Sequence, residues 1–452
     1  MANGDNQIDN YLTTIGWGRY QSQIFIICGT SVFNIMIWGY IVSLLLVRLG
    51  DNWNLERFEL GIIGSIYGLG ASLGSLFFGF LSDRFGRMFS FRVSILVVWV
   101  ATLFVIFSFN MIMLSLVLFF IGAGASSDQV LSATILKEFI SNKNTSILAV
   151  YTLFYRLGGA TIAIIIIIVE VINPTIMSDW KIITIIIFFW NSAQLIQRQF
   201  MDETPKFLYS VGKLTKAEEV LRKISKKNKK LLEIKLTELE VTYNEEISEI
   251  PNKKSVKTLF IKENIKTTLL ITIIGFLMAF ANISIIIYAP TFLSKYTLTL
   301  RYTAILIQQL GGFLGSLAAG KMVKNRFGPK GALSLSSVLV GCYIYCFFLT
   351  FEILTVIIFL CLYQFIFQIS LGAIWIIVPE SFSTELRSTF IGWFMLWQGM
   401  AGVFAPIIIG VFIDFGGSPA AISVISFCHL ASGILTLLLN SPKLLNKEEN
   451  LI

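Results

Sequence analysis

The stretch Gly79-Phe80-Leu81-Ser82-Asp83-Arg84-Phe85-Gly86-Arg87 decides the fold, because part of it occurs twice. Its Asp-Arg-Phe-Gly segment follows a long apolar run, and the similar Asn325-Arg326-Phe327-Gly328 follows another such run 242 positions later. Glu138 and Glu380, at the ends of two further apolar runs, are separated by the same 242 positions. Two matches at one spacing indicate an internal duplication, so the chain is predicted to consist of two similar halves.

Apolar runs long enough to span a membrane recur along the whole chain. The 452 residues are 55% hydrophobic and 14% charged, with a mean hydropathy of +0.77, which is too apolar for a soluble domain of this size. A helix that crosses a bilayer needs roughly 20 apolar residues. Such runs occur at about 22–47, 58–80, 89–109, 112–136, 146–171, 180–199, 267–293, 302–323, 331–351, 353–378, 389–413 and 419–440. The sequence therefore predicts an all-α polytopic membrane protein of about 12 transmembrane helices in two six-helix halves.

Positive charge is distributed unevenly among the loops between these runs. With the amino terminus placed inside, and with charges near the ends of runs counted with the adjacent loop, 29 of the 35 Lys and Arg residues are on the cytoplasmic side and one, Arg156, lies deep within a run. The five on the outer side of the membrane are Arg48, Arg57, Lys181, Lys295 and Arg301. Because Lys and Arg favour cytoplasmic loops, both termini are predicted to be cytoplasmic, in a protein of the plasma membrane. The net charge of +8 lies mostly between the halves, where the same rule explains it without nucleic-acid binding.

The charged segment between the halves divides the chain into three parts. These are an N-terminal six-helix half at 1–199, a cytoplasmic linker at 200–265 and a C-terminal six-helix half at 266–452. In the linker, Ala217, Val220, Leu221 and Ile224 follow helical spacing, which predicts short amphipathic helices. A solvated linker and a partner-binding loop are both compatible with its charge. The five cysteines and the single His429 show no metal-ligand spacing, so neither a metal nor a cofactor is expected.

Two ionisable residues are predicted to lie deep in the membrane. Asp128 lies ten positions before Glu138, at the cytoplasmic end of the fourth run, and Arg156 ten positions after Ser146, at the start of the fifth. Both should therefore lie roughly 15 Å from the cytoplasmic boundary. A charge at that depth costs at least about 2.5 to 3.5 kcal/mol and normally has a partner. We therefore expect Asp128 and Arg156 to pair. They would form either a structural lock, or a site in which Arg156 binds an anionic or polyhydroxylated substrate and Asp128 balances it or takes a coupling proton.

Two further groups of residues are candidates for function. Gln129, Tyr288, Trp375 and Gln398 are candidate walls of a substrate cavity, although each also suits ordinary packing. A second group, at the cytoplasmic ends of the runs, is a candidate conformational gate: Asp83, Arg84, Gly86, Arg87, Glu138, Glu380 and Arg387. Asp83 can accept hydrogen bonds from the amino terminus of a helix in the other half, and such a contact would close the cytoplasmic side in one state only.

The motif Gly79-x-x-x-Asp83-Arg84-x-Gly86-Arg87 resembles the signature of the major facilitator superfamily. Residues 202–208 and 379–387 resemble signatures of its branch of sugar porters and phosphate/proton symporters. The segment from Gly122 to Glu138, with Asp128 inside it, is similar to the fourth span of the phosphate symporters. Asn34 and Ser284 stand near the places of two acidic residues that those symporters carry. This resemblance implies the two-half helical fold and gradient-driven transport by alternating access.

The sequence and the resemblance together predict a secondary transporter that works as a monomer in the lipid bilayer. Its substrate would be a small polar metabolite such as a sugar, an organic acid or phosphate, alone or with a proton. The alternative is a transporter-like receptor that senses a ligand without net transport. An enzyme is not expected, because the runs contain no visible cluster of nucleophile, base or metal ligands, and the chain has no Gly-x-x-x-x-Gly-Lys-Ser/Thr nucleotide motif.

Overall fold

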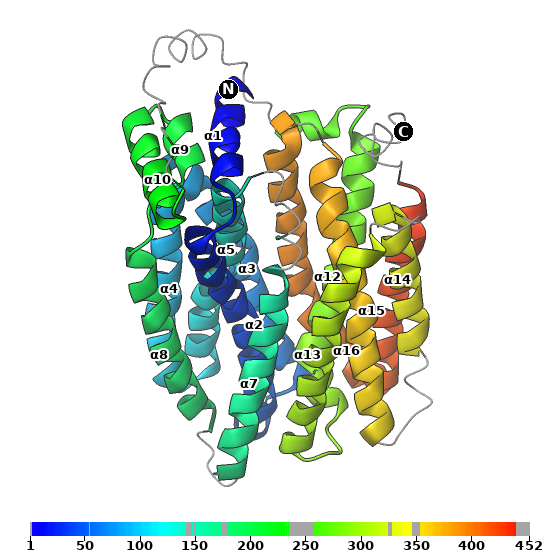
Figure 1. The fold of residues 1–452 in the computed structure, drawn as a ribbon. Helices are drawn as coiled ribbons and strands as arrows, with labels where there is room; N and C mark the ends of the chain where they lie inside the picture. Colours follow the sequence, from blue (N-terminus) through cyan, green and yellow to red (C-terminus); the bar gives the residue numbers. More distant parts are fainter. Residues whose placement is uncertain are drawn as a thin grey trace.

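The computed structural model describes residues 2–53, 55–141, 147, 151–172, 179–230, 232, 234, 256–323, 328–345, 353–382 and 384–439, and these residues form helices and no strand. Figure 1 shows two bundles of long helices side by side, with both ends of the described part of the chain at one end of the molecule. The first bundle consists of α2 (Arg19–Trp53), α3 (Arg57–Phe85), α4 (Arg87–Ile106), α5 (Met111–Phe139), α7 (Leu153–Ile172) and α8 (Asp179–Gln199). The second consists of α12 (Ile265–Phe292), α13 (Leu298–Met322), α14 (Gly328–Tyr345), α15 (Ile353–Glu380) and α16 (Thr384–Leu437).

The helix α16 covers two of the predicted apolar runs. Its two parts meet at a kink at Gly417, whose φ of 69° lies in the left-handed region that favours glycine. With this kink counted, the described helices provide a counterpart for every predicted run. The all-α fold in two halves is therefore confirmed.

Nine helices in the described part of the chain are long and apolar enough to cross a membrane. The helices α8 and α14 coincide with predicted runs but are not among the nine. In α8, Asn191, Gln194 and Arg198 lower the hydropathy, yet all three are buried inside the first bundle. Large apolar side chains cover the outside instead; Phe189 and Phe200 are 68% and 81% exposed. This distribution suits a surface that contacts lipid.

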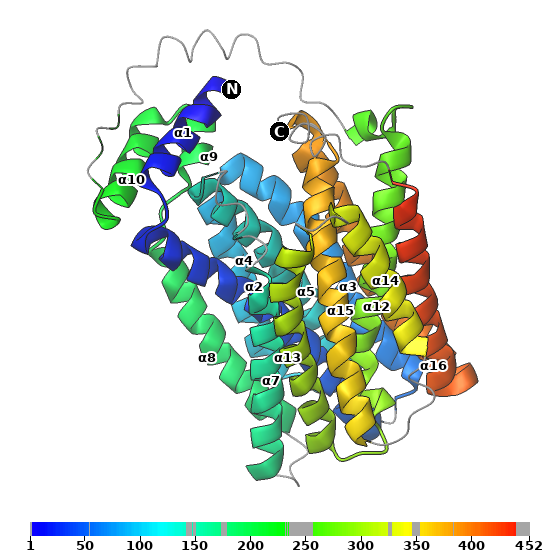
Figure 2. The ribbon, with the colours of Figure 1, turned by 45° about the vertical axis from the view of Figure 1, so that its right-hand side comes forward.

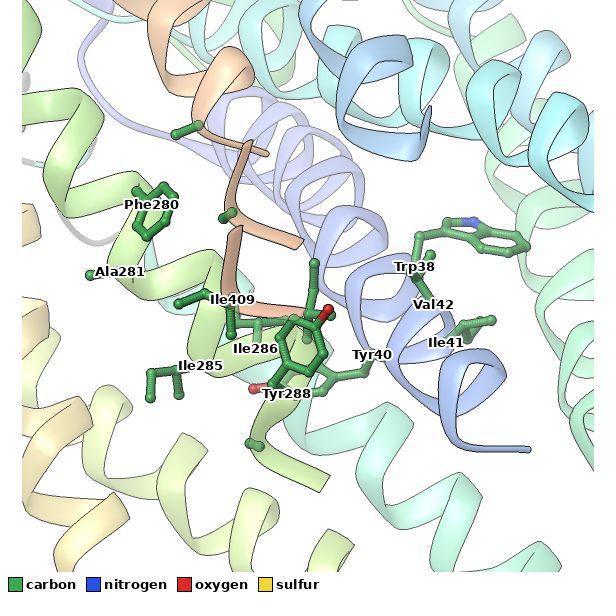
Figure 3. Packing of buried hydrophobic residues seen from close by; sticks show 14 of the residues in the cluster. Trp38, Tyr40, Ile41, Val42, Phe280, Ala281, Ile285, Ile286, Tyr288 and Ile409 are labelled. Atoms are coloured by element: carbon green, nitrogen blue, oxygen red, sulfur yellow. The ribbon is translucent and has the colours of Figure 1, made fainter. Parts of the chain in front are cut away.

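In the described part of the chain, the two bundles pack against each other mainly through three pairs of helices: α2 with α12, α3 with α16 and α7 with α13. Figure 3 shows Tyr40 of α2 close to Ile286 and Tyr288 of α12, in the central pair. Towards the end away from the termini, the Ser43 hydroxyl donates to the Ile287 carbonyl at 2.8 Å and the Ser65 hydroxyl to the Val403 carbonyl at 2.6 Å. The halves are therefore fastened to each other at this end.

Three short helices form a cluster at the end that carries the termini (Figures 1 and 2). We call α1 (Ala2–Ile15), α9 (Pro205–Ser210) and α10 (Leu214–Lys227) the terminal cluster. Ile8 and Leu12 of α1 are buried in the same apolar core as Leu221 and Ile224 of α10. The short 3-10 helix η3 (Val256–Phe260) precedes α12. The helix α1 is not among the predicted elements, because its few apolar residues are separated by polar ones.

Candidate functional site

A cavity of about 220 Å³ lies between the two bundles, and α2, α3, α5, α7, α12, α15 and α16 all contribute to its wall. Most of the wall is aliphatic or aromatic. The polar side chains on it are Tyr67, Ser75, Ser126, Gln129, Tyr155, Arg156, Asn282 and Gln398. Among the described residues that line it there is one charge, Arg156, and no carboxylate. The cavity is thus mainly apolar with a single fixed positive charge.

Four of the six predicted substrate-site residues line this cavity: Arg156, Gln129, Trp375 and Gln398. Tyr288 does not line it. Its hydroxyl donates to the Pro406 carbonyl at 2.7 Å and connects α12 to α16. The sixth predicted residue, Asp128, also does not line it, so its predicted role in substrate binding has no support from the wall of the cavity.

Arg156 is held by neutral amides of the opposite half. Its Nε donates to Gln368 Oε1 at 3.0 Å and its Nη1 to Gln309 Oε1 at 3.4 Å. With the Gln364 amide turned so that its oxygen faces Arg156, that oxygen accepts from Nη1 at 2.7 Å and from Nη2 at 3.0 Å. The side chain is 3% exposed, and within the described part of the chain none of its partners is a carboxylate. Its positive charge is therefore oriented but not neutralised.

The three glutamines around Arg156, on α13 and α15, were not predicted from the sequence. Gln364 and Gln368 are one helical turn apart in an otherwise apolar run, so they share a helix face. Such a pair inside a membrane span is a signal for a buried polar contact. Gln309 also donates through Nε2 to the Tyr40 hydroxyl at 2.6 Å, which connects the same group to α2.

Asp128 pairs with Arg198, so the predicted pair of Asp128 and Arg156 is wrong. Arg198 Nη2 lies 2.6 Å from Asp128 Oδ2, and Nη1 lies 2.8 Å from Oδ1. The prediction failed because α5 packs against α2, α3 and α4, whereas α7 packs against α2 and α13, so these helices are consecutive along the chain without forming a pair. Arg198 was counted with the cytoplasmic charges because it lies in the last turn of α8. Side chains on a helix tilt toward its amino terminus, which directs this one back into the bundle.

The Asp128–Arg198 pair fastens four helices of the first half. Arg198 also donates to the Phe91 carbonyl at 2.6 Å and to the Ser31 hydroxyl at 2.9 Å, and its guanidinium lies 3.7 Å from the centre of the Phe91 ring. Ser94 donates to Asp128. Both charged side chains are at most 1% exposed. Contacts from α2, α4, α5 and α8 therefore meet at one buried ion pair.

The predicted gate residues whose side chains are described make contacts within the first half. Arg87 Nε donates to Glu138 Oε1 at 3.1 Å, and Thr204 donates to the other oxygen of Glu138. The Arg84 guanidinium lies over the Phe85 ring, 5.5 Å from its centre. Gly86 joins α3 to α4 with a φ of 111°. The side chains of three other predicted gate residues, Asp83, Glu380 and Arg387, lie outside the described residues.

Glu203 belongs to this group of contacts although the sequence did not single it out as a site residue. Its carboxylate accepts from the backbone N–H of Arg87 at 3.2 Å and of Met88 at 3.2 Å, at the amino terminus of α4. Such a position favours a negative charge. Burial nevertheless raises the pKa of Glu203 above its usual value, and the neighbouring Glu138 adds to this, while the backbone hydrogen bonds lower it.

Comparison with known proteins gives consistent matches over most of the chain. A family profile described as Sugar (and other) transporter matches residues 19–440. The niacin transporter NiaP of Acinetobacter baylyi is 23% identical over 386 residues, covering 82% of each chain. Organic cation/carnitine transporter 7 of Arabidopsis thaliana is 22% identical over 96% of this chain and 92% of that protein. A partially occluded inward open structure of the xylose transporter XylE from E. coli matches with a TM-score of 0.78 and 14% identity, covering 94% of this chain and 98% of that one.

Proposed function

The chain belongs to the sugar (and other) transporter family of the major facilitator superfamily, as its motifs predicted, and we propose that it carries a small organic anion, which it binds at Arg156. The predicted function of a secondary transporter of a small metabolite is confirmed by the family. One observation carries the finer proposal. Arg156 is a cation in the wall of the central cavity, and its partners in the described part of the chain are uncharged amides.

An anionic substrate would supply the charge that this cavity lacks. A cation without a counter-charge is costly in an apolar environment, so a bound anion gains more there than in water. A guanidinium also matches a carboxylate through two parallel hydrogen bonds, and the glutamines hold its plane in place. The relative named for niacin supports an anion, because niacin carries a carboxylate on a ring. A cationic substrate would be repelled by Arg156, and a sugar would leave most of its hydroxyl groups against an apolar wall.

Uptake into proteoliposomes tests this proposal. Purified protein should take up radiolabelled nicotinate or benzoate, and neither xylose nor carnitine should compete. Arg156→Gln should reduce anion uptake at least about tenfold, because it removes a charge-assisted contact worth about 1.5 to 3 kcal/mol. Arg222→Gln is the matched control, since that side chain is 61% exposed on α10. Unchanged anion uptake by Arg156→Gln would refute the proposal, and binding without uptake would favour the receptor alternative.

We include the remaining sequence predictions, on orientation, oligomeric state, location and the gate, in the same proposal. Both termini and the linker at 200–265 face the cytoplasm, and the protein works as a monomer in the plasma membrane without enzymatic activity. A proton is the candidate co-substrate. The gate is proposed to consist of Asp83, Arg84, Gly86, Arg87, Glu138, Glu380 and Arg387. Two of its members, Arg87 and Glu138, form an ion pair at 3.1 Å that joins the ends of α4 and α5 within the first half.

A further inference from the structure

We infer that the cavity recognises a substrate with two different polar ends: a carboxylate at Arg156 and an uncharged hydrogen-bonding group at the opposite side, with an aromatic body between them. The inference rests on the proposed transport of an organic anion. It adds the residues that recognise the second end of the substrate and the chemical class of that end.

The two polar sides of the cavity lie at opposite flanks of the contact between the halves. Arg156 lies on α7, which packs against α13, and its partners come from α13 and α15. Gln398 lies on α16, which packs against α3. A Cβ atom on the adjacent Gly399 would lie 2.5 Å from Ser72 Oγ of α3, which shows how close the two helices are there. The central pair of helices, α2 and α12, lies between these flanks.

Three amide side chains form the second polar side, and we call Gln129, Asn282 and Gln398 the amide group. All three line the cavity. Gln129 lies on α5, which is tied to α3 by a 2.6 Å hydrogen bond between Ser75 and Ser126, and Asn282 lies on α12, which packs along α16. Gln129 and Gln398 therefore belong to the flank formed by α3, α5 and α16, and Asn282 adjoins it from α12.

The amide group has unused hydrogen-bonding capacity. Asn282 Oδ1 is buried and has no partner in the described part of the chain, and there the side chains of Gln129 and Gln398 also form no hydrogen bond. A buried polar group left without a partner typically costs about 1 to 3 kcal/mol. A hydroxyl on the substrate could donate to Asn282 Oδ1, and a ring nitrogen could accept from the amide N–H groups of Gln129 or Gln398. A second carboxylate would not be favoured, because the amide group carries no positive charge.

Aromatic side chains from both flanks of the cavity suit a single aromatic ring as the body of the substrate. Tyr67, Tyr155, Phe367 and Trp375 all line the cavity. Trp375 is positioned by the edge of Phe394, with ring centres 6.2 Å apart and planes at 84°. The volume of about 220 Å³ is below the roughly 300 to 1,000 Å³ typical of pockets for drug-sized ligands. The substrate is thus a small aromatic monocarboxylate with a polar, uncharged substituent or ring atom.

Paired ligands test the two-ended recognition. Affinities for benzoate and 4-hydroxybenzoate are measured by calorimetry on the purified full-length protein, since these differ in one hydroxyl group. The wild type should bind 4-hydroxybenzoate about tenfold more tightly, as one additional hydrogen bond to an otherwise unpaired group would give. Gln398→Met should reduce this ratio toward one, because it removes a hydrogen-bonding partner of the hydroxyl group that benzoate lacks. Gln199→Met, at the exposed end of α8, is the matched control that keeps the wild-type ratio.

The possible results separate this inference from the proposed function. If the wild type binds both ligands equally, or binds terephthalate as tightly as 4-hydroxybenzoate, the inference is overturned while binding of an anion stands. If neither anion binds, the proposed function fails with it. If Gln398→Met does not fold, Gln129→Met takes its place in the test. If the folded variant keeps the wild-type ratio of affinities for 4-hydroxybenzoate and benzoate, the amide group does not recognise the hydroxyl group. Arg156→Gln should weaken both ligands together and leave their ratio unaltered.

Discussion

Removing Arg198 should damage the protein more than removing Asp128, although the two form one ion pair. Breaking a buried pair by deleting one partner costs about 3 to 5 kcal/mol. After Asp128→Asn, Arg198 keeps the Phe91 carbonyl, the Ser31 hydroxyl and the Phe91 ring. After Arg198→Met, the Asp128 carboxylate is left in a site where it is fully buried, with Ser94 as its remaining described donor. Hydrogen bonds to charged groups contribute about 1.5 to 3 kcal/mol each. Arg198→Met should therefore lower the free energy of unfolding by about 5 kcal/mol or more, and Asp128→Asn by about 3 kcal/mol.

The assay is the temperature at which detergent-solubilised protein loses its monodisperse peak in size-exclusion chromatography, with expression level as a second readout. The double variant Asp128→Leu with Arg198→Met removes both charges and should recover most of the loss. Transport by that double variant would assign the pair a purely structural role, whereas a folded double variant without transport would assign it a further one. The reasoning fails if Asp128→Asn is the more damaging single variant, or if both single variants melt like the wild type.

Three other predictions concern separate features. Gly68→Ala should lower the melting temperature and impair transport, because the added Cβ would lie 2.2 Å from the Gly402 carbonyl oxygen. Gly320→Ala, whose added Cβ would have nothing within 4 Å, should be neutral or slightly stabilising, and equal melting temperatures of the two variants would contradict this. Glu203 has a raised pKa, so the folded state holds its proton more tightly than the unfolded state, and this contribution to stability is lost as the pH rises above 4.5. Glu203→Gln should flatten that part of the curve of melting temperature against pH, and an unchanged curve would show that Glu203 is not its cause. A cysteine placed at Lys227 should react with an impermeant maleimide only after cells are permeabilised, and labelling of intact cells would reverse the proposed orientation.

The fold was predictable because it depends on properties that a sequence carries locally. Twelve apolar runs and one repeated motif are sufficient to give the number and grouping of the helices. The break inside α16 follows from the same kind of signal. Gly417 lies in the interval between the predicted runs at 389–413 and 419–440, where Gly416, Gly417 and Pro419 interrupt the apolar pattern.

The partners of buried charges were not predictable in the same way. Depth along a helix can be counted from the sequence, and Arg156 does line the central cavity. Which helix lies next to another is set by packing of the whole bundle, and therefore Asp128 was matched with the wrong arginine. Arg198 was missed for a related reason, since a long side chain in the last turn of a helix reaches a depth that its position in the sequence does not show.

The terminal cluster is attached to one half of the molecule at several points. Asn228, just after α10, accepts a hydrogen bond from the Tyr20 backbone N–H at the start of α2, and Glu203, just before α9, binds the amino terminus of α4. A protein of 50.7 kDa embedded in a detergent micelle offers little outside the micelle for aligning particle images in electron cryomicroscopy. An antibody fragment raised against the exposed face of α10 would serve as a fiducial for the first half alone. Images aligned on this fragment would then show directly how far the second half moves relative to the first.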